Sequence, residues 1–157
     1  MNSMFQNYAE LTVLNLKSFD TSSVTAMNFM FNNCKKLTNI YFSDKFNTEN
    51  VETMLNMFSN CESLTSLDLT YFITENVVTM AYMFQNMYKL EYIALTSFIP
   101  SKVTNMYGMF NQCKSLKTLL ISNFDEGNVI NLSYFCYFCT SLTSINLSNF
   151  KTKKVQN

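Results

Sequence analysis

Sulfur-containing side chains are the first candidates for chemistry in this sequence, because its 157 residues include 11 Met and five Cys. Met-x-x-Met pairs recur along the chain, and thioethers are soft ligands of the kind that bind copper(I). Apolar residues spaced by three and four positions usually pack in a core, however. We therefore interpret the pairs as core residues and expect no metal and no cofactor. The pairs are Met1/Met4, Met27/Met30, Met54/Met57, Met80/Met83 and Met106/Met109.

Four of the five cysteines occupy one position of a repeat that is described below: Cys34, Cys61, Cys113 and Cys139. On helices of neighbouring repeats, roughly 8–10 Å apart, they would exceed the Cα reach of a disulfide, which is about 7 Å. We therefore predict buried free thiols. Cys136-x-x-Cys139 differs, because residues i and i+3 share a helix face and this pair is able to oxidise. Burial remains the favoured interpretation there too.

The side chains that most enzymes need are missing. The chain has no His and two Gly, and all its basic residues are Lys. These facts exclude a Ser-His-Asp triad, His-ligated zinc and a glycine-rich phosphate loop. Asp68 lies near Asp44, but nothing supplies a carboxyl group of raised pKa for acid–base catalysis. We therefore predict that the protein is not an enzyme.

Charge and hydropathy limit the partners. The formal net charge is +0, which argues against nucleic acid or an anionic membrane as the main partner. Apolar runs are a few residues long, so we expect no membrane insertion, and residues 1–7 do not resemble a signal peptide.

An internal repeat must position all of these residues. Met-Phe recurs from Met4-Phe5 to Met109-Phe110 at intervals of 26 or 27 residues, and Val, Phe and Leu columns keep the same register. The extra residue of the longer interval lies in Ser43-Asp44-Lys45. We predict a single array, residues 1–157, of six repeats: 1–26, 27–53, 54–79, 80–105, 106–131 and 132–157.

Each repeat combines two periodicities. Leu64 to Phe72 reads LxxLxLxxF, and its central alternation predicts a short strand. The following stretch places Val77, Met80, Met83, Phe84 and Met87 at the spacing of a helix of about three turns. Thr21, Thr48 and Thr74 are its expected N-caps, and Asn33, Asn60 and Asn86 its left-handed C-caps. The sequence thus predicts an α/β solenoid, a right-handed superhelix of about six strand-turn-helix coils. Parallel strands would form the inner wall and helices the wider outer wall, and that mismatch would curve the stack.

The repeat resembles the BspA-like leucine-rich repeats over essentially the whole chain. The fullest match runs from Cys61 through Leu64, Leu67, Leu69 and Phe72 to Val77. Met87 and Tyr8 depart from the repeat Cys. The resemblance implies a cell-surface or secreted binding protein, often an adhesin, and no active site.

The inner wall is the expected binding surface, because residues that flank the strand leucines point outward there. This surface is neutral and polar with a few aromatic anchors, which suits a protein or glycan ligand. The candidate residues are Asn15, Asn39, Tyr41, Ser66, Asp68, Tyr92, Thr118, Leu120 and Asn146.

The two ends suggest an alternative function. Neither end has the polar cap that usually terminates a solenoid, and residues 155–157 followed by 1–5 would restore the VxxMxxMF motif. The segment is then a slice of a longer array, or separate molecules stack head to tail into a fibre. The candidate stacking residues are Met1, Met4, Phe5, Leu11, Leu14, Leu142, Ile145, Leu147, Phe150 and Val155.

Overall fold

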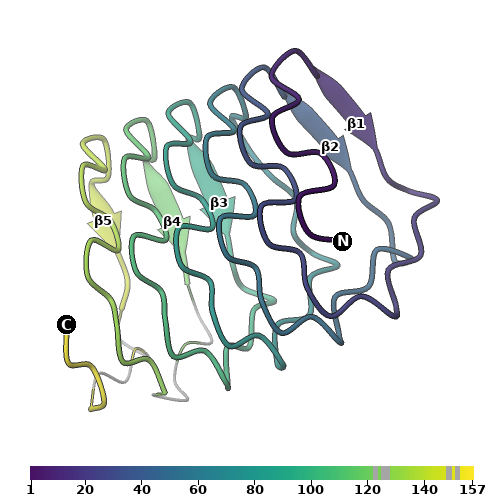
Figure 1. Cartoon of the computed structure of the whole chain (residues 1–157). Helices are drawn as coiled ribbons and strands as arrows, with labels where there is room; N and C mark the ends of the chain where they lie inside the picture. Colours follow the sequence, from purple (N-terminus) through teal and green to yellow (C-terminus); the bar gives the residue numbers. More distant parts are fainter. Residues whose placement is uncertain (122–123, 125–127, 148–149, 151–152) are drawn as a thin grey trace.

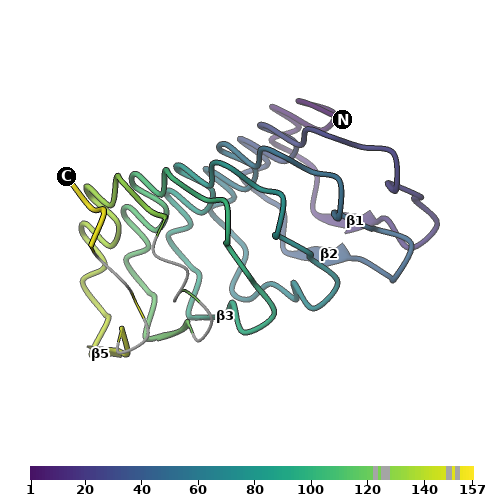
Figure 2. The same cartoon turned by 90° about the horizontal axis from the view of Figure 1, so that it is seen from below.

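The computed structural model of the chain describes residues 1–121, 124, 128–147, 150 and 153–157. Flat coils lie side by side in one row, with the two termini in the coils at opposite ends of the row (Figures 1 and 2). No helix in this part of the chain is long and apolar enough to cross a membrane.

One wall of the stack carries short parallel strands, and we call it the strand wall. Its first sheet pairs β1 (Val13–Asn15) with β2 (Asn39–Tyr41); its second sheet has the order β3 (Tyr92–Ala94), β4 (Thr118–Leu120) and β5 (Ser144–Ile145). Strand partners lie one repeat apart, as in the pairs Leu14↔Ile40 and Ile93↔Leu119. The middle residue of each three-residue strand faces the interior and the first faces solvent, because side chains alternate along a strand.

The predicted helices are wrong: the described residues contain none, so the fold is not an α/β solenoid with a helical outer wall. The segments expected to be helical form consecutive tight turns instead. Each repeat places two residues in the left-handed region, as at Phe29 and Asn33, where φ is 57° and 62°. An α-helix cannot contain such residues. The other non-glycine residues with positive φ are Ser3, Asn7, Asn56, Asn60, Tyr82, Asn86, Gln112, Tyr134 and Phe138.

Backbone hydrogen bonds explain why turns replace helices. In the second coil the N–H groups of Phe29, Phe31 and Asn33 donate to carbonyls of the next coil at 2.9–3.0 Å. The alternate N–H groups, such as those of Asn32 and Cys34, close local turns at 3.1 Å. The wall that these turns form, which we call the outer wall, is therefore hydrogen-bonded from coil to coil, as the strand wall is. Because the described residues contain no helix, the predicted difference in spacing between strands and helices does not arise, and it cannot curve the stack.

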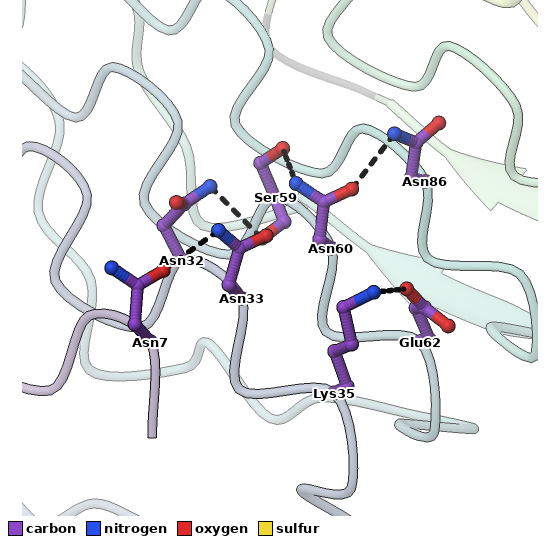
Figure 3. A network of polar contacts seen from close by, with 8 residues as sticks. All are labelled: Asn7, Asn32, Asn33, Lys35, Ser59, Asn60, Glu62 and Asn86. Atoms are coloured by element: carbon purple, nitrogen blue, oxygen red, sulfur yellow. Dashed lines mark hydrogen bonds and ion pairs between the residues drawn. The ribbon is translucent and has the colours of Figure 1, made fainter. Parts of the chain in front are cut away.

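Asparagine side chains add a second set of bonds along the outer wall (Figure 3). Asn33 Nδ2 donates to Asn7 Oδ1, and Asn86 Nδ2 donates to Asn60 Oδ1, each at 2.8 Å. Beside them, Lys35 Nζ lies 3.1 Å from Glu62 Oε1 of the next coil. The asparagines expected to cap helices thus adopt the left-handed conformation, but they do so within turns and bond to the same position of a neighbouring coil.

The threonines expected to be N-caps form hydrogen bonds to the neighbouring coil instead. Thr48 is fully buried, and its hydroxyl donates to the Ile73 carbonyl and accepts from the Ile73 N–H, both at 2.7 Å. Thr21 Oγ1 donates to the Asn47 carbonyl at 2.6 Å. Isolated parallel β-bridges also join neighbouring coils. They pair Ala26 with Thr53, Thr53 with Thr79, Thr79 with Asn105, and Asn105 with Asn131.

Columns of identical side chains fill the interior. The rings of Phe31, Phe58, Phe84 and Phe110 are fully buried and stack at centroid distances of 5.1–5.7 Å. The methionines from Met27 to Met109 in the predicted pairs are also fully buried. Burying each such side chain contributes roughly 1.5–3 kcal/mol. Because each ring lies against its copy in the next coil, this burial depends on stacking.

Candidate functional site

The strand wall is interrupted at one coil. Residues 66–68 do not form a strand, so β2 and β3 are edge strands that face each other across this coil (Figure 1). The Glu91 N–H still donates to the Thr65 carbonyl at 2.9 Å. The longer repeat, with its extra residue in Ser43–Lys45, directly precedes the break.

Two hollows flank the interrupted coil. The hollow on the β2 side has a volume of 420 Å³ and is lined by Lys17, Thr38, Asn39, Ile40, Tyr41, Phe42, Ser66, Leu67, Asp68 and Tyr71. The hollow on the β3 side has a volume of 430 Å³ and is lined by Ser66, Leu67, Asp68, Leu69, Thr70, Tyr92, Ala94, Thr96 and Ser97. Ile40 and Leu67 are 8% and 9% exposed, whereas Ile93 is 0% exposed. The two hollows therefore lie over an apolar layer that stays buried.

Asp68 lines both hollows and carries a negative charge. Its Oδ1 accepts hydrogen bonds from the Thr70 hydroxyl at 2.6 Å and from the Thr70 N–H at 3.0 Å. These bonds favour the ionised carboxyl and hold the pKa of Asp68 below its usual value. A fixed carboxylate on an exposed wall can pair with a cationic group or accept hydrogen bonds from a ligand.

Three half-exposed tyrosines surround this carboxylate. Tyr41 and Tyr71 line the first hollow and Tyr92 the second, and they are 42–46% exposed. Lys17 Nζ lies 5.7 Å from the centroid of the Tyr41 ring, within reach of a cation–π contact. Amphipathic rings beside one positive and one negative side chain form the kind of surface that proteins use as interface anchors.

The structure places most of the predicted surface residues at these hollows. Asn39 and Tyr41 lie in the first, Tyr92 lies in the second, and Ser66 and Asp68 lie in both. Thr118, Leu120 and Asn146 line a separate hollow of 290 Å³ over β4 and β5. Asn15 lines none of these hollows, and its Oδ1 accepts from the Lys17 N–H at 3.1 Å.

Lys17, Thr70 and Tyr71 are among the residues of these hollows that the sequence did not predict. All three follow the strand segment, whereas the prediction took the residues that flank the strand leucines. Tyr71 directly precedes Phe72, which belongs to the buried Phe column of the repeat. An aromatic residue outside the buried columns was the signal that could have identified Tyr71 as a surface residue. The break itself has no such signal, since Leu67 and Leu69 alternate as in the other repeats.

The predicted stacking residues lie in the two end coils. Most of them are half-buried and pack against the core from one side, while Met4 and Leu147 are 44% exposed. Most of their counterparts in the next coils inward, such as Phe31 for Phe5, are buried. The half-buried residues are Met1, Phe5, Leu11, Leu14, Leu142, Ile145, Phe150 and Val155.

The thiols lie in the interior or at its edge. Cys34, Cys61 and Cys113 are fully buried free thiols that donate to the carbonyl of a Phe one coil back, at 3.0–3.2 Å. Burial raises the pKa of each. Cys136 and Cys139 are half-buried. Across the described residues, no group of three or more His, Cys, Asp or Glu side chains is arranged to hold a metal ion.

Comparison with known proteins identifies a family and one similar structure. A family model described as "Mycoplasma protein of unknown function, DUF285" matches residues 1–94 and again residues 87–157. The crystal structure of the T. pallidum leucine-rich repeat protein TpLRR is similar at 20% identity with a TM-score of 0.42. The similarity covers 76% of this chain and 61% of the T. pallidum chain. No curated protein matches the sequence.

Proposed function

We propose that this chain, which belongs to the family described as Mycoplasma protein of unknown function, DUF285, is a non-catalytic module that binds a protein ligand through the strand wall. The interrupted coil with its two hollows is the observation that supports this proposal most directly. It combines exposed tyrosines, one fixed carboxylate and one lysine.

A protein ligand fits the break better than a glycan does. The strand wall at this coil presents exposed aromatic rings beside a carboxylate, which are side chains of the kind that anchor protein interfaces. Tyr41, Tyr71 and Tyr92 supply anchors for apolar side chains, and Asp68 supplies an acceptor for a Lys or Arg of the ligand.

Peptide display tests this function. A library of random peptides displayed on phage is selected on the immobilised chain, and enriched peptides are titrated against variants. We expect Tyr41→Ala combined with Tyr92→Ala to weaken the selected peptides at least tenfold. Tyr137→Ala, which removes an equally exposed ring from the outer wall, should leave affinity unchanged. Binding that survives the double variant, or enrichment of glycans alone on a parallel array, would refute the proposal.

A location at the cell surface and a role in adhesion belong to the same proposal, since the repeat resembles BspA-like surface proteins. Brief protease treatment of intact cells that produce the protein tests the location. Loss of the protein from treated cells, while a cytosolic marker remains, is the expected result. Full protection of the protein on intact cells would contradict a surface location.

Head-to-tail assembly is the second candidate function, and the half-buried apolar residues of the end coils favour it. Phe5 and Leu14 at one end, and Leu142 and Ile145 at the other, have a packing neighbour on one side. Another copy of the chain would cover them with the same ring and leucine columns. Negative-stain microscopy of the 157-residue chain across a concentration series should then show rods that lengthen with concentration. Short particles of constant length at every concentration would refute assembly.

A further inference from the structure

Two tyrosines of neighbouring coils meet on the outer wall, and the proposed function uses neither of them. The ring centroids of Tyr82 and Tyr107 lie 5.0 Å apart, and the ring planes make an angle of 63°. At such a distance the edge of one ring contacts the face of the other. Both residues are half-buried, and each belongs to a coil that has another coil on either side. The contact therefore does not depend on how the stack ends.

A glycine in the next coil directs the two rings toward each other. The residue that corresponds to Tyr82 one repeat later is Gly108, and Tyr107 directly precedes it. Because Gly108 has no side chain, the Tyr82 ring lies against its backbone, where a Cβ atom would stand 2.8 Å from Tyr82 Cδ1. The Tyr82 N–H also donates to the Tyr107 carbonyl at 2.8 Å, which holds the two residues side by side.

The hydroxyl ends of the two rings also meet. Burial, together with a hydrogen bond that the Tyr82 hydroxyl donates to the Tyr107 hydroxyl, raises the pKa of Tyr82. When two phenol hydroxyls bond to each other, the ring carbons next to them, the ortho carbons, lie toward the facing sides of the pair. The ortho carbons are the atoms through which phenoxyl radicals couple.

We propose that Tyr82 and Tyr107 form an oxidative cross-linking site, at which a one-electron oxidant joins the fourth and fifth coils through a dityrosine bond. A haem peroxidase with hydrogen peroxide is an oxidant of this class. Each phenol gives up one electron and its hydroxyl proton and becomes a phenoxyl radical. The two radicals couple through one ortho carbon each, so that one C–C bond forms.

The balance of this step is complete. Each coupled carbon releases its hydrogen as a proton while the phenol oxygen takes up a proton, which restores both aromatic rings. The peroxide accepts two electrons and two protons, and its O–O bond breaks. Two tyrosines and one hydrogen peroxide thus become one dityrosine and two waters.

The cross-link joins two coils that are otherwise held by hydrogen bonds and packing. It closes a loop over residues 82–107 and so restricts the unfolded chain, as a disulfide does. Because the backbones of Tyr82 and Tyr107 are already bonded in register, coupling requires little movement of the folded chain. We therefore expect the linked chain to unfold at a higher urea concentration than the unlinked chain.

Tyr134 is the competing partner for Tyr107. Its ring centroid lies 5.4 Å from that of Tyr107, and the two ring planes make an angle of 54°. The structure favours Tyr82, because its ring is closer to Tyr107 and its hydroxyl donates to the Tyr107 hydroxyl. The two pairings give different peptides, so one experiment distinguishes them.

Peptide mapping after oxidation tests the pairing. The folded chain is treated with a haem peroxidase and hydrogen peroxide, the monomer is isolated by gel filtration, and the protein is cleaved after lysine. Tyr82 then lies in peptide 46–89 and Tyr107 in peptide 103–114, whereas Tyr134 lies in peptide 118–151. We expect peptides 46–89 and 103–114 to be linked, with a mass two hydrogens below their sum. Fragmentation should place the link at Tyr82 rather than at Tyr71 or Tyr88 of the same peptide.

Matched variants separate this site from general oxidation. Tyr107→Phe keeps the ring but lacks the hydroxyl, and it should lower the yield of linked monomer at least tenfold while circular dichroism stays unchanged. Tyr134→Phe and Tyr92→Phe should leave the link between peptides 46–89 and 103–114 in place. A main product that links peptides 103–114 and 118–151, or oxidised tyrosines without any linked peptide, would overturn the proposal. Equal urea midpoints for the linked and unlinked chains would also contradict it.

Discussion

The backbone of Gly108 lies against the ring of Tyr82 in the neighbouring coil. A Cβ atom at position 108 would lie 2.8 Å from Tyr82 Cδ1 and 2.9 Å from Tyr82 Cε1, and Gly108 has φ of 58°. The Tyr82 ring continues into a row along the outer wall, 5.0 Å from Tyr107, which is 5.4 Å from Tyr134. The other repeats hold a non-glycine residue with positive φ at this position, so the close approach of the Tyr82 ring, added to the left-handed backbone, is what favours glycine here.

Gly108→Ala is expected to destabilise the fold by about 1–2 kcal/mol from the left-handed backbone alone, and by more because the Tyr82 ring must shift. Urea unfolding monitored by circular dichroism measures the change. In a Tyr82→Ala background the same substitution should lose only the backbone part, so the two changes are non-additive. Equal effects of Gly108→Ala in both backgrounds would contradict the contact.

Asn60 adopts φ of 62° and accepts the side-chain bond from Asn86 at 2.8 Å. Asn60→Ala should cost about 1–2 kcal/mol for the backbone and about 0.5–1.5 kcal/mol for the lost hydrogen bond. Asn60→Gly keeps the backbone conformation and should lose only the second part. The difference between the two variants in urea unfolding isolates the left-handed conformation. Equal destabilisation by alanine and glycine would show that this conformation does not matter.

The outer wall shows where prediction from the sequence stops. Met27, Met30, Phe31 and Cys34 have helical spacing, yet they are buried by two consecutive turns. Two turns of four residues bring the same positions to one side as a helix does, so apolar spacing does not distinguish them. The sequence does carry a signal for the turns, because Asn33, Asn60 and Asn86 occupy one position of the repeat. Asparagine fits a left-handed turn as well as the end of a helix, so this signal did not distinguish the two structures.

The strand wall was predicted more closely than its interruption. Register follows from the columns, so Leu14 lies beside Ile40 and Ile93 lies beside Leu119, one repeat apart. The break at residues 66–68 depends on how the longer repeat meets the next coil, and the alternation of Leu67 and Leu69 carries no sign of it. The sequence therefore predicted Tyr41, Asp68 and Tyr92 as surface residues but not the hollows that bring them together.

Thr48→Val is expected to destabilise the fold, because it leaves both the N–H and the carbonyl of Ile73 without the threonine hydroxyl. Each buried polar group that loses its partner costs about 1–3 kcal/mol. Thr48→Ser retains the hydroxyl and serves as the matched control in urea unfolding. If the serine variant lost as much stability as the valine variant, the methyl group rather than the hydroxyl would be responsible.

Acid should remove the contribution of Asp68 to stability. The bonds from Thr70 lower the pKa of Asp68 in the folded state below its ordinary value of 3.8. A carboxyl with a depressed folded pKa stabilises the fold above its unfolded pKa, and this contribution is lost as pH falls through the folded pKa. Asp68→Asn should therefore lower the free energy of unfolding at neutral pH and change it progressively less as pH falls below 3.8. A urea-unfolding series across pH measures this difference.

Asp20 is the matched control, because its pKa is also lowered, by hydrogen bonds from Ser22, and it lies outside the hollows beside residues 66–68. Asp20→Asn should show the same direction of pH dependence in stability. For peptides selected on the strand wall, however, Asp68→Asn should weaken binding at neutral pH, and Asp20→Asn should leave it unchanged. The Asp68 carboxylate can pair with a cationic group of the ligand, whereas Asp20 interacts with Ser22 and Lys45 and lines neither hollow. Equal losses of affinity in the two variants would show that Asp68 is not part of the binding surface.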